Sequence, residues 1–301
     1  MQIIKGRKKM PFNLILFGVP GIGKSTWAAS APKPVFIGSE ENDELEVDRF
    51  PIPESFDAFK GQLAHLIANP MGYRTVVVDT LDAIEKLLHK KILASDPKQT
   101  GAMIAAHGGY GKAYEKAESE LIEIRAMLKT LRDKHGMNVI LLAHSKKVKA
   151  TDTVLGLEYD TFELALHPKA QAVFVDWVSA VLFANYVAKA KDGVNSDKVF
   201  AMGHGQRTLF TEKRPGHLGK NRYSLPFEMD LDFAQFYDAF NAFYDSNETD
   251  PAKLIAKIAG LMSNISDKAL VETISKTVED NKDNLTMLKR VVARIEEMIG
   301  A

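Results

Sequence analysis

The residues most able to do chemistry lie near the start of the chain, in the glycine-rich stretch 18–26. Its spacing is G-x-x-x-x-G-K-S, in which glycines let the backbone wrap closely around phosphate oxygens. The ammonium of Lys24 can reach the β- and γ-phosphates, and the hydroxyl of Ser25 can ligate Mg²⁺. The residues expected to bind a nucleoside triphosphate are Gly18, Pro20, Gly21, Ile22, Gly23, Lys24, Ser25 and Thr26.

The sequence on either side supplies the elements that such a loop needs. An apolar run at 12–17 predicts a buried strand before the loop, and residues 27–29 are compatible with a helix after it. A helix that begins near Gly23 directs the partly positive end of its dipole toward the same anion. A strand–turn–helix that needs glycine only for its turn is the alternative interpretation.

Asp79 is the expected metal-binding carboxylate. It ends the β-branched run at 73–78, which is typical of a buried parallel strand. In this position a carboxylate can bind Mg²⁺ beside the hydroxyl of Ser25, whereas the alternative is an aspartate that only caps the next helix. No glutamate follows Asp79 until Glu85, so a catalytic base directly after this strand is excluded.

The order of apolar runs predicts the fold. Buried strands are expected at 12–17, 35–38, 73–78 and 139–143, with helices at 56–68, 80–93 and 113–134. This alternation predicts an α/β fold with a mostly parallel central sheet covered on both faces. Short strands at 179–186, 198–202 and 208–213 predict an antiparallel extension at the sheet edge. We expect an ATPase core at 1–245 and a small helical C-terminal appendage at 246–301.

Composition fits a cytosolic protein. The 301 residues are 46% hydrophobic and 26% charged, which allows a sizeable core, and the formal net charge is zero. Any contact with nucleic acid must therefore come from a local basic patch. There is no cysteine, which excludes disulfides and thiolate metal sites, and no apolar run is long enough to cross a membrane.

Five segments carry a resemblance to a known family: 18–26, 38–42, 76–80, 141–145 and 219–222. They are similar to the RecA superfamily, and more narrowly to the phage-encoded, core-only ATPases of single-strand annealing recombination, AAA-type ATP-binding proteins of phage. The resemblance covers residues 10 to about 230. It implies a RecA-like P-loop core that uses ATP and Mg²⁺ in the cytoplasm of a phage-infected bacterial host. The chain lacks the zinc-binding cysteines and the protease-like domain of a full-length RadA.

The resemblance also implies roles for residues outside the phosphate loop. It places the catalytic base at Glu40, with Glu41 as the second candidate, and solvated loop charges are the alternative. It places a γ-phosphate contact at His144, and Ser145 is the second candidate for this contact. The alternative is that His144 has only a structural role. The segment 219–222 is followed by an aromatic residue and resembles a RadA motif. By that likeness Lys220 and Arg222 act on the γ-phosphate of a neighbouring subunit, in a ring or a filament.

Two segments are expected to contact single-stranded DNA. RecA-like proteins hold DNA with two loops, one after each of the strands that end here at Asp79 and His144. The first is the glycine-rich region at 95–111 with its neighbours, and the second begins at Ser145. Aromatic and basic side chains suit base stacking and phosphate neutralisation, although solvated loops are the alternative. The DNA-binding candidates are Tyr110, Lys112, Lys146, Lys147 and Lys149.

Three functions follow from these features. The first is a DNA-dependent ATPase that assembles as an oligomer on single strands, promotes annealing or strand exchange and works beside a single-strand-binding protein. The second is a hexameric helicase or loader. The third is a nucleotide-switched assembly factor that DNA does not stimulate. The basic segments favour the first two functions, and the lack of helicase accessory domains favours the first.

Overall fold

The computed structural model describes residues 8–38, 44–151, 156–186, 189–192, 199–202, 205–245, 251–265 and 267–299. The chain divides into a large unit, Met10–Phe240, and a smaller unit that contains Asn241–Ala301. The large unit contains every residue predicted to bind the nucleotide.

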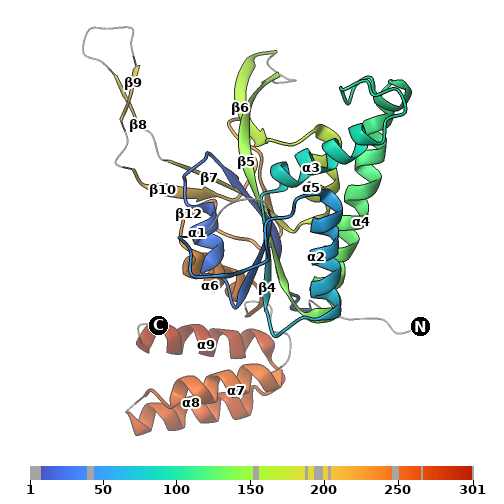
Figure 1. Ribbon diagram of the computed structural model, residues 1–301. Helices are drawn as coiled ribbons and strands as arrows, with labels where there is room; N and C mark the ends of the chain where they lie inside the picture. Colours follow the sequence, from blue (N-terminus) through green and yellow to red (C-terminus); the bar gives the residue numbers. More distant parts are fainter. Residues whose placement is uncertain are drawn as a thin grey trace. The chain divides into compact units, whose positions relative to one another are not determined.

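A ten-stranded sheet forms the centre of the large unit, in the order β12-β10-β7-β1-β5-β4-β2-β3 (Figure 1). The strands that run parallel are β1 (Asn13–Gly18), β2 (Pro34–Gly38), β3 (Asp48–Arg49), β4 (Thr75–Asp79), β5 (Asn138–Thr151) and β7 (Ala180–Tyr186). The antiparallel strands are β6 (Glu158–Leu164), β10 (Arg207–Phe210), β11 (Lys220–Asn221) and β12 (Glu228–Asp230). The predicted mostly parallel α/β sheet with antiparallel strands at its edge is confirmed. Of the three segments predicted for that extension, however, 179–186 forms the strand β7, which is parallel to β1, and the described part of 198–202 lies outside this sheet.

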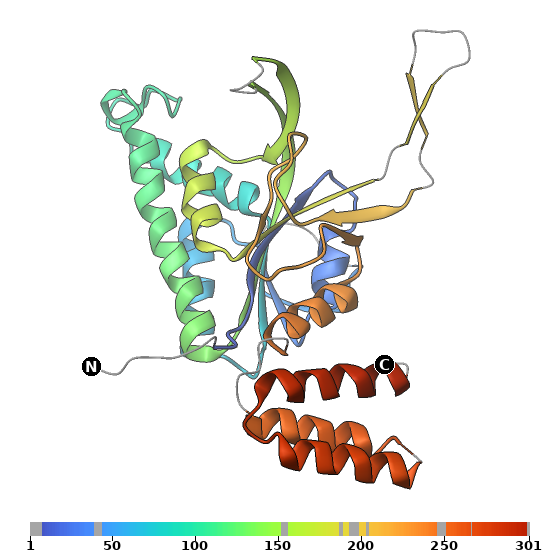
Figure 2. The same cartoon turned by 180° about the vertical axis from the view of Figure 1, so that it is seen from behind.

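Helices cover both faces of this sheet (Figures 1 and 2). One face carries α2 (Phe56–Ala68), α3 (Leu81–Ala94), α4 (Lys112–His135) and α5 (Pro168–Trp177), and the other carries α1 (Lys24–Ala29) and α6 (Phe233–Asp245). A short 3₁₀ helix, η1 (Ala106–Gly108), precedes α4. Every residue of β1 and β4 is buried, because a parallel sheet with helices on both faces has no solvated side.

The strand β5 is longer than the apolar run predicted. It continues past His144 to Thr151 and pairs with β6, so the region after 144 begins as a β-hairpin and not as an unpatterned loop (Figure 1). Residues 147–151 alternate between exposed polar and half-buried apolar side chains, but only Val148 and Ala150 are apolar, so the alternation is short and weak as a strand signal. A second ribbon pairs β8 (Lys189–Asp192) with β9 (Val199–Met202).

The smaller unit has its own apolar core. Its helices are α7 (Pro251–Met262), α8 (Lys268–Asp280) and α9 (Leu285–Ile299). Leu254, Ile258 and Leu288 are buried together, as the amphipathic pattern of these helices requires. Within the described part of the chain, each helix is either too short or too polar to cross a bilayer.

An aromatic cluster holds α6 against the sheet and α1. Phe236 is fully buried, with its ring centroid 5.4 Å from that of Phe12 in a T-shaped contact and 5.2 Å from that of Trp27. Such pairs add stabilisation beyond the area that they bury. Trp27 belongs to the helix that follows the phosphate loop, so this cluster also fixes the position of that helix.

We predict that Phe236→Ala lowers the free energy of unfolding of the large unit by about 3–5 kcal/mol, because it leaves a cavity under α1. Chemical denaturation measures the change. Ile122→Ala, at an exposed position of α4, is the control and should cost under about 1 kcal/mol. Equal losses in the two variants would contradict a core role for Phe236.

Candidate active site

Parallel pairing brings three predicted residues to one edge of the sheet. Gly18 at the end of β1 lies in register with His144 of β5, and Asp79 ends β4 beside Gly38 of β2. Because β4 and β5 are also parallel neighbours, the phosphate loop, the carboxylate and the imidazole share the carboxyl edge of the sheet. Ligands of open α/β sheets bind at this edge.

The phosphate loop has the backbone that phosphate binding requires. Gly21 and Gly23 have φ values of 74° and 103°, which side-chain-bearing residues rarely adopt. Lys24 begins α1, is only 6% exposed, and donates from Nζ to the carbonyls of Val19 at 3.2 Å and Gly18 at 3.4 Å. The ammonium therefore lies across the mouth of its own loop, where a phosphate oxygen can replace a carbonyl as its partner.

Ser25 and Asp79 meet as predicted. The Oγ of Ser25 donates to Oδ2 of Asp79 over 2.6 Å, and the carboxylate is buried. Hydroxyl and carboxylate oxygens are the ligands that Mg²⁺ prefers, and two protein ligands suffice when phosphates and waters supply the rest. Accordingly, the described residues contain no cluster of three or more His, Asp or Glu that would hold a metal ion without the nucleotide.

A cavity of about 290 Å³ joins these groups. It is lined by Gly21, Gly23, Lys24, Ser25, Thr26, Glu44, Leu45, Asp79, Thr80 and His144. The hydroxyl of Thr80 is buried in the cavity wall, and no described residue hydrogen-bonds to it. The unsatisfied hydroxyl of Thr80, the ammonium of Lys24 and the carboxylate of Asp79 lie around the backbone of the phosphate loop. This set of groups fits a Mg²⁺–triphosphate and its waters.

Close packing of the backbone places Asp79. A Cβ added at Gly38 would lie 2.0 Å from the carbonyl oxygen of Asp79, so any side chain there would displace the carboxylate strand. The glycine is therefore required by the approach of β2 to β4, and it directly precedes the segment that contains the predicted base. Glu40 and Glu41 themselves lie outside the described residues.

His144 is held by a residue that sequence analysis missed. Oδ1 of Asp82 accepts the backbone N–H of His144 and Oδ2 contacts its Nδ1, both at 2.9 Å. Burial raises the pKa of Asp82, but the hydrogen bonds from the ring and backbone of His144 outweigh this effect, so the pKa lies below its usual value. Asp82 is one helical position inside α3, and only the fold brings it to the end of β5.

Arg207 is a second residue that the sequence did not reveal. It begins β10, and its Nη1 donates to the carbonyl of Ile22 at 3.4 Å. The same nitrogen would lie 2.7 Å from a Cβ at Gly23, so the guanidinium rests directly on the phosphate loop. It thereby adds a positive charge beside the loop from the antiparallel part of the sheet.

The structure does not bring Lys220 and Arg222 to this cavity. Lys220 pairs in β11 with Val181, and Arg222 donates its backbone N–H to Ser179, at the amino end of β7. The N–H of Ser179 bonds to Asn13, five residues before Gly18, so Arg222 lies about 16 Å along the strand from the phosphate loop. Neither residue is placed to act on the nucleotide of its own chain.

Lys220 instead caps a helix. Its Nζ donates to the carbonyls of Val175 at 2.7 Å and Asp176 at 3.1 Å, near the end of α5. Burial and the neighbouring charge of Arg222 lower the pKa of this ammonium. A lysine at a helix C-terminus satisfies unpaired carbonyls and complements the helix dipole.

The first DNA-binding candidate segment is an ordered turn and not an open loop. Asp96 is buried and accepts hydrogen bonds from the N–H and hydroxyl of Thr100 and from the N–H of His107, which hold its pKa far below the usual value. Around this anchor Tyr110 is 98% exposed, and Lys112 begins α4. An exposed aromatic side chain therefore stands on a rigid support.

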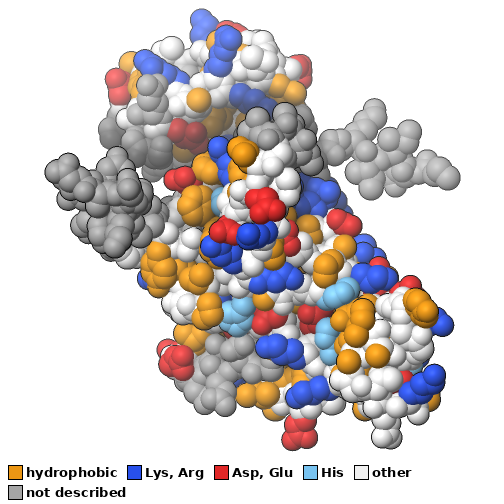
Figure 3. Space-filling view, turned by 90° about the horizontal axis from the view of Figure 1, so that it is seen from above, with side chains coloured by type: hydrophobic (Ala, Val, Ile, Leu, Met, Phe, Trp, Pro, Cys, Tyr) orange, Lys and Arg blue, Asp and Glu red, His pale blue; other side chains and the backbone are white. Residues whose placement is uncertain are grey.

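The lysines of the second segment have partners within the hairpin. Lys147 contacts Asp160 at 2.7 Å and Lys149 contacts Glu158 at 3.6 Å, and these pairs are exposed. Lys146 donates to the carbonyl of Leu166 at 2.6 Å. In the view from above, acidic and basic side chains are accordingly interspersed (Figure 3).

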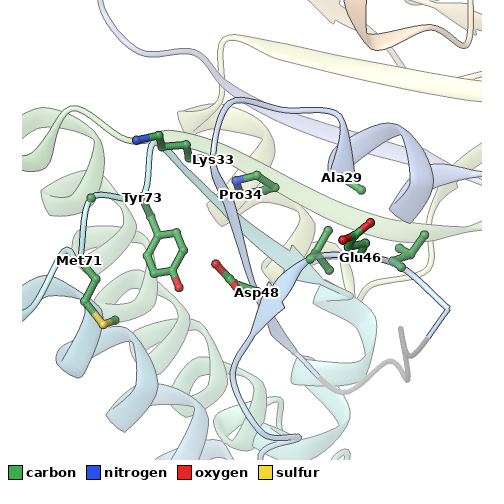
Figure 4. A pocket seen from close by; sticks show the side chains of 10 residues that line it. Ala29, Lys33, Pro34, Glu46, Asp48, Met71 and Tyr73 are labelled. Atoms are coloured by element: carbon green, nitrogen blue, oxygen red, sulfur yellow. The ribbon is translucent and has the colours of Figure 1, made fainter.

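A larger cavity of about 580 Å³ lies near the start of β2, at the end of α1 (Figure 4). Tyr73 and Asp48 face one another across it, and burial together with Asp48 raises the pKa of the tyrosine. Leu45 lines this cavity and the phosphate cavity. The smaller cavity is the candidate active site, because it alone of the two contains Lys24, Ser25 and Asp79.

Fold and site together define a P-loop nucleotide-binding protein. Residues 10–223, more than half of the chain, match a family described as "AAA domain", and the protein belongs to that family. Membership indicates an AAA-type ATPase that binds a nucleotide and, as is usual for such ATPases, uses Mg²⁺. A comparison with curated proteins found no match.

We predict that Asp79→Asn removes most of the Mg²⁺ dependence of nucleotide binding, because the amide loses the charge that attracts the ion. Isothermal titration of ATP in a Mg²⁺ series measures the effect. Asp48→Asn, in the larger cavity, is the matched control and should keep the Mg²⁺ dependence. A wild-type response in Asp79→Asn would exclude this carboxylate as the metal ligand.

Proposed function

We propose that this AAA-domain ATPase is a RecA-like recombinase, which binds single-stranded DNA in its ATP-bound state and promotes annealing or strand exchange as an oligomer. The observation that carries the proposal is the continuity of β5. One strand contains His144, which lines the phosphate cavity, and within five residues contains Lys146, Lys147 and Lys149. A change at the phosphates therefore has a continuous path along β5 to the lysines of the hairpin.

The glycine-rich segment supports the same function. It follows β4 and α3, so both candidate DNA segments come after residues of the phosphate cavity, Asp79 on β4 and His144 on β5. The exposed ring of Tyr110 suits base stacking, which is sequence-tolerant because every base has a π-face. Binding to a segment already held by Asp96 would cost little ordering entropy.

The ion pairs of the hairpin do not prevent DNA binding. Lys147 and Lys149 are exposed, and exposed pairs of this kind are worth only about 0–1 kcal/mol. DNA phosphates can therefore replace Asp160 and Glu158 as partners. Lys146 is less available, because its ammonium caps the carbonyl of Leu166.

One observation favours a second function. The acids of β6 balance the lysines of β5, so the hairpin carries little net charge and would also suit a protein partner. In that case the chain is a nucleotide-switched assembly factor. ATPase assays with and without single-stranded DNA separate the two functions: stimulation supports the recombinase, and its absence favours the assembly factor. A hexameric helicase or loader would add processive unwinding of a duplex.

We predict that Lys147→Ala with Lys149→Ala weakens single-strand binding in the presence of a non-hydrolysable ATP analogue. Each lost phosphate contact should flatten the slope of log affinity against log salt by about 0.7. Fluorescence anisotropy over a salt series measures both effects. Lys129→Ala is the matched control, because Lys129 is also ion-paired and has the same 59% side-chain exposure as Lys147 but lies on α4.

The reciprocal variant sharpens this test. Glu158→Gln with Asp160→Asn removes the negative charges that pair with Lys147 and Lys149 and should tighten single-strand binding. If the hairpin instead contacts a protein, neither pair of substitutions changes affinity for DNA.

We predict that Arg222→Ala binds ATP but hydrolyses it slowly, because in this proposal Arg222 reaches the γ-phosphate of a neighbouring subunit. Arginine fingers of other ATPases and GTPases contribute on the order of 10³–10⁵ in rate. Mixing Arg222→Ala with Lys24→Ala should restore activity, since a mixed interface can combine an intact phosphate loop with an intact finger. If subunits exchange and activity does not return, Arg222 does not act in trans.

A further inference from the structure

We propose that Asp82 is a positioning residue for ATP hydrolysis, which fixes the tautomer and orientation of His144 so that its Nε2 faces the phosphates. The inference rests on hydrolysis taking place in the phosphate cavity. It assigns a function to a buried carboxylate that hydrogen-bonds to His144.

Asp82 contacts His144 through both of its carboxylate oxygens. One carboxylate oxygen accepts the backbone N–H of His144 and the other contacts Nδ1, both at 2.9 Å. Two bonds from one rigid side chain fix the strand position and the ring together. Asp82 is itself held in the first turn of α3, where the helix dipole favours a negative charge.

The ionisation state of Asp82 determines which ring nitrogen of His144 carries a proton. The pKa of Asp82 is lowered, so this group is ionised near neutral pH and can only accept hydrogen bonds. Nδ1 of His144 must then carry a proton. Nε2 is on the opposite side of the ring, and within the described part of the chain it has no hydrogen-bond partner. Because His144 lines the phosphate cavity, Nε2 is the atom left to meet the phosphates or the attacking water.

Asp82→Asn tests this assignment with almost no change in shape. The amide oxygen can still accept the backbone N–H, but the amide nitrogen would face Nδ1 and donate to it. The proton on Nδ1 is then lost and the neutral ring becomes the Nε2–H tautomer. We expect kcat to fall about 10-fold to 100-fold while KM for ATP changes less than about twofold, the cost of a misplaced group beside a reacting centre.

Glu85→Gln is the matched control. Glu85 lies one turn further along the same helix and is equally buried. It accepts the backbone N–H of His167 at 3.1 and 3.2 Å, and its Oε1 lies 3.9 Å from Nε2 of His89. The glutamine keeps an oxygen acceptor for that bond. Its kcat should remain close to wild type, which separates the positioning of His144 from the general cost of removing a buried charge in α3.

A double variant tests whether Asp82 affects kcat through His144. His144→Ala should lower kcat by a similar factor, and adding Asp82→Asn to it should cause no further loss, because the aspartate acts through the imidazole. Independent, additive losses would overturn the proposal. So would wild-type kcat in Asp82→Asn when His144→Ala is impaired.

Nitrogen NMR of histidine-labelled protein measures whether Nδ1 of His144 is protonated. A purely structural role of Asp82 predicts no change in this protonation. Comparison with His144→Ala assigns the ring signals, which should show a protonated Nδ1 in the wild type and an unprotonated Nδ1 in Asp82→Asn. An unprotonated Nδ1 in the wild type would overturn the proposal without any variant at position 82. Hydrolysis that persists in Lys24→Ala would instead show that the phosphate cavity is not the active site.

Discussion

The register of the parallel strands is the constraint on which the site depends. Gly18, Asp79 and His144 are distant in sequence, yet each ends or interrupts an apolar run near the carboxyl edge of the sheet. Gly18 is in register with His144, and Asp79 follows Val78, which is in register with Leu141. A shift of one residue in any pairing would turn every side chain of that strand to the other face. The fully buried faces of β1 and β4 prevent such a shift, so the energy of the core also sets the geometry of the phosphate cavity.

The second level of organisation is the helix α3, which follows β4 directly. Asp82 holds the N–H of His144, and Glu85 holds the N–H of His167 beyond the end of β6. One turn of helix therefore anchors both ends of the region that contains the hairpin. A buried acceptor that lost its donor would cost about 1–3 kcal/mol, so α3 and the hairpin should move together or not at all.

Much of this arrangement could be predicted from the sequence because its signals are local. The phosphate-loop spacing and the apolar runs before Asp79 and His144 predict the strands and the edge at which they meet. The pairing of Ser25 with Asp79 follows from that edge. Asp82 and Arg207 gave no signal, because their partners are 62 and 185 residues away and depend on the assembled sheet. The hairpin after His144 was missed because its alternation rests on only two apolar residues, Val148 and Ala150, in an otherwise polar segment.

If Arg222 acts on a neighbouring subunit, its position determines how the subunits contact one another around the phosphate cavity. The phosphate cavity lies at the carboxyl edge of the sheet and Arg222 at its amino edge, separated by about 16 Å of strand. An arginine that reaches a neighbour's phosphate from there would join unlike surfaces of two identical chains. Such heterologous contacts do not close in pairs, and they generate rings or filaments according to the rotation between subunits. If Arg222 acts in trans, a symmetric dimer is inactive, and activity requires the head-to-tail contact from which rings and filaments are built.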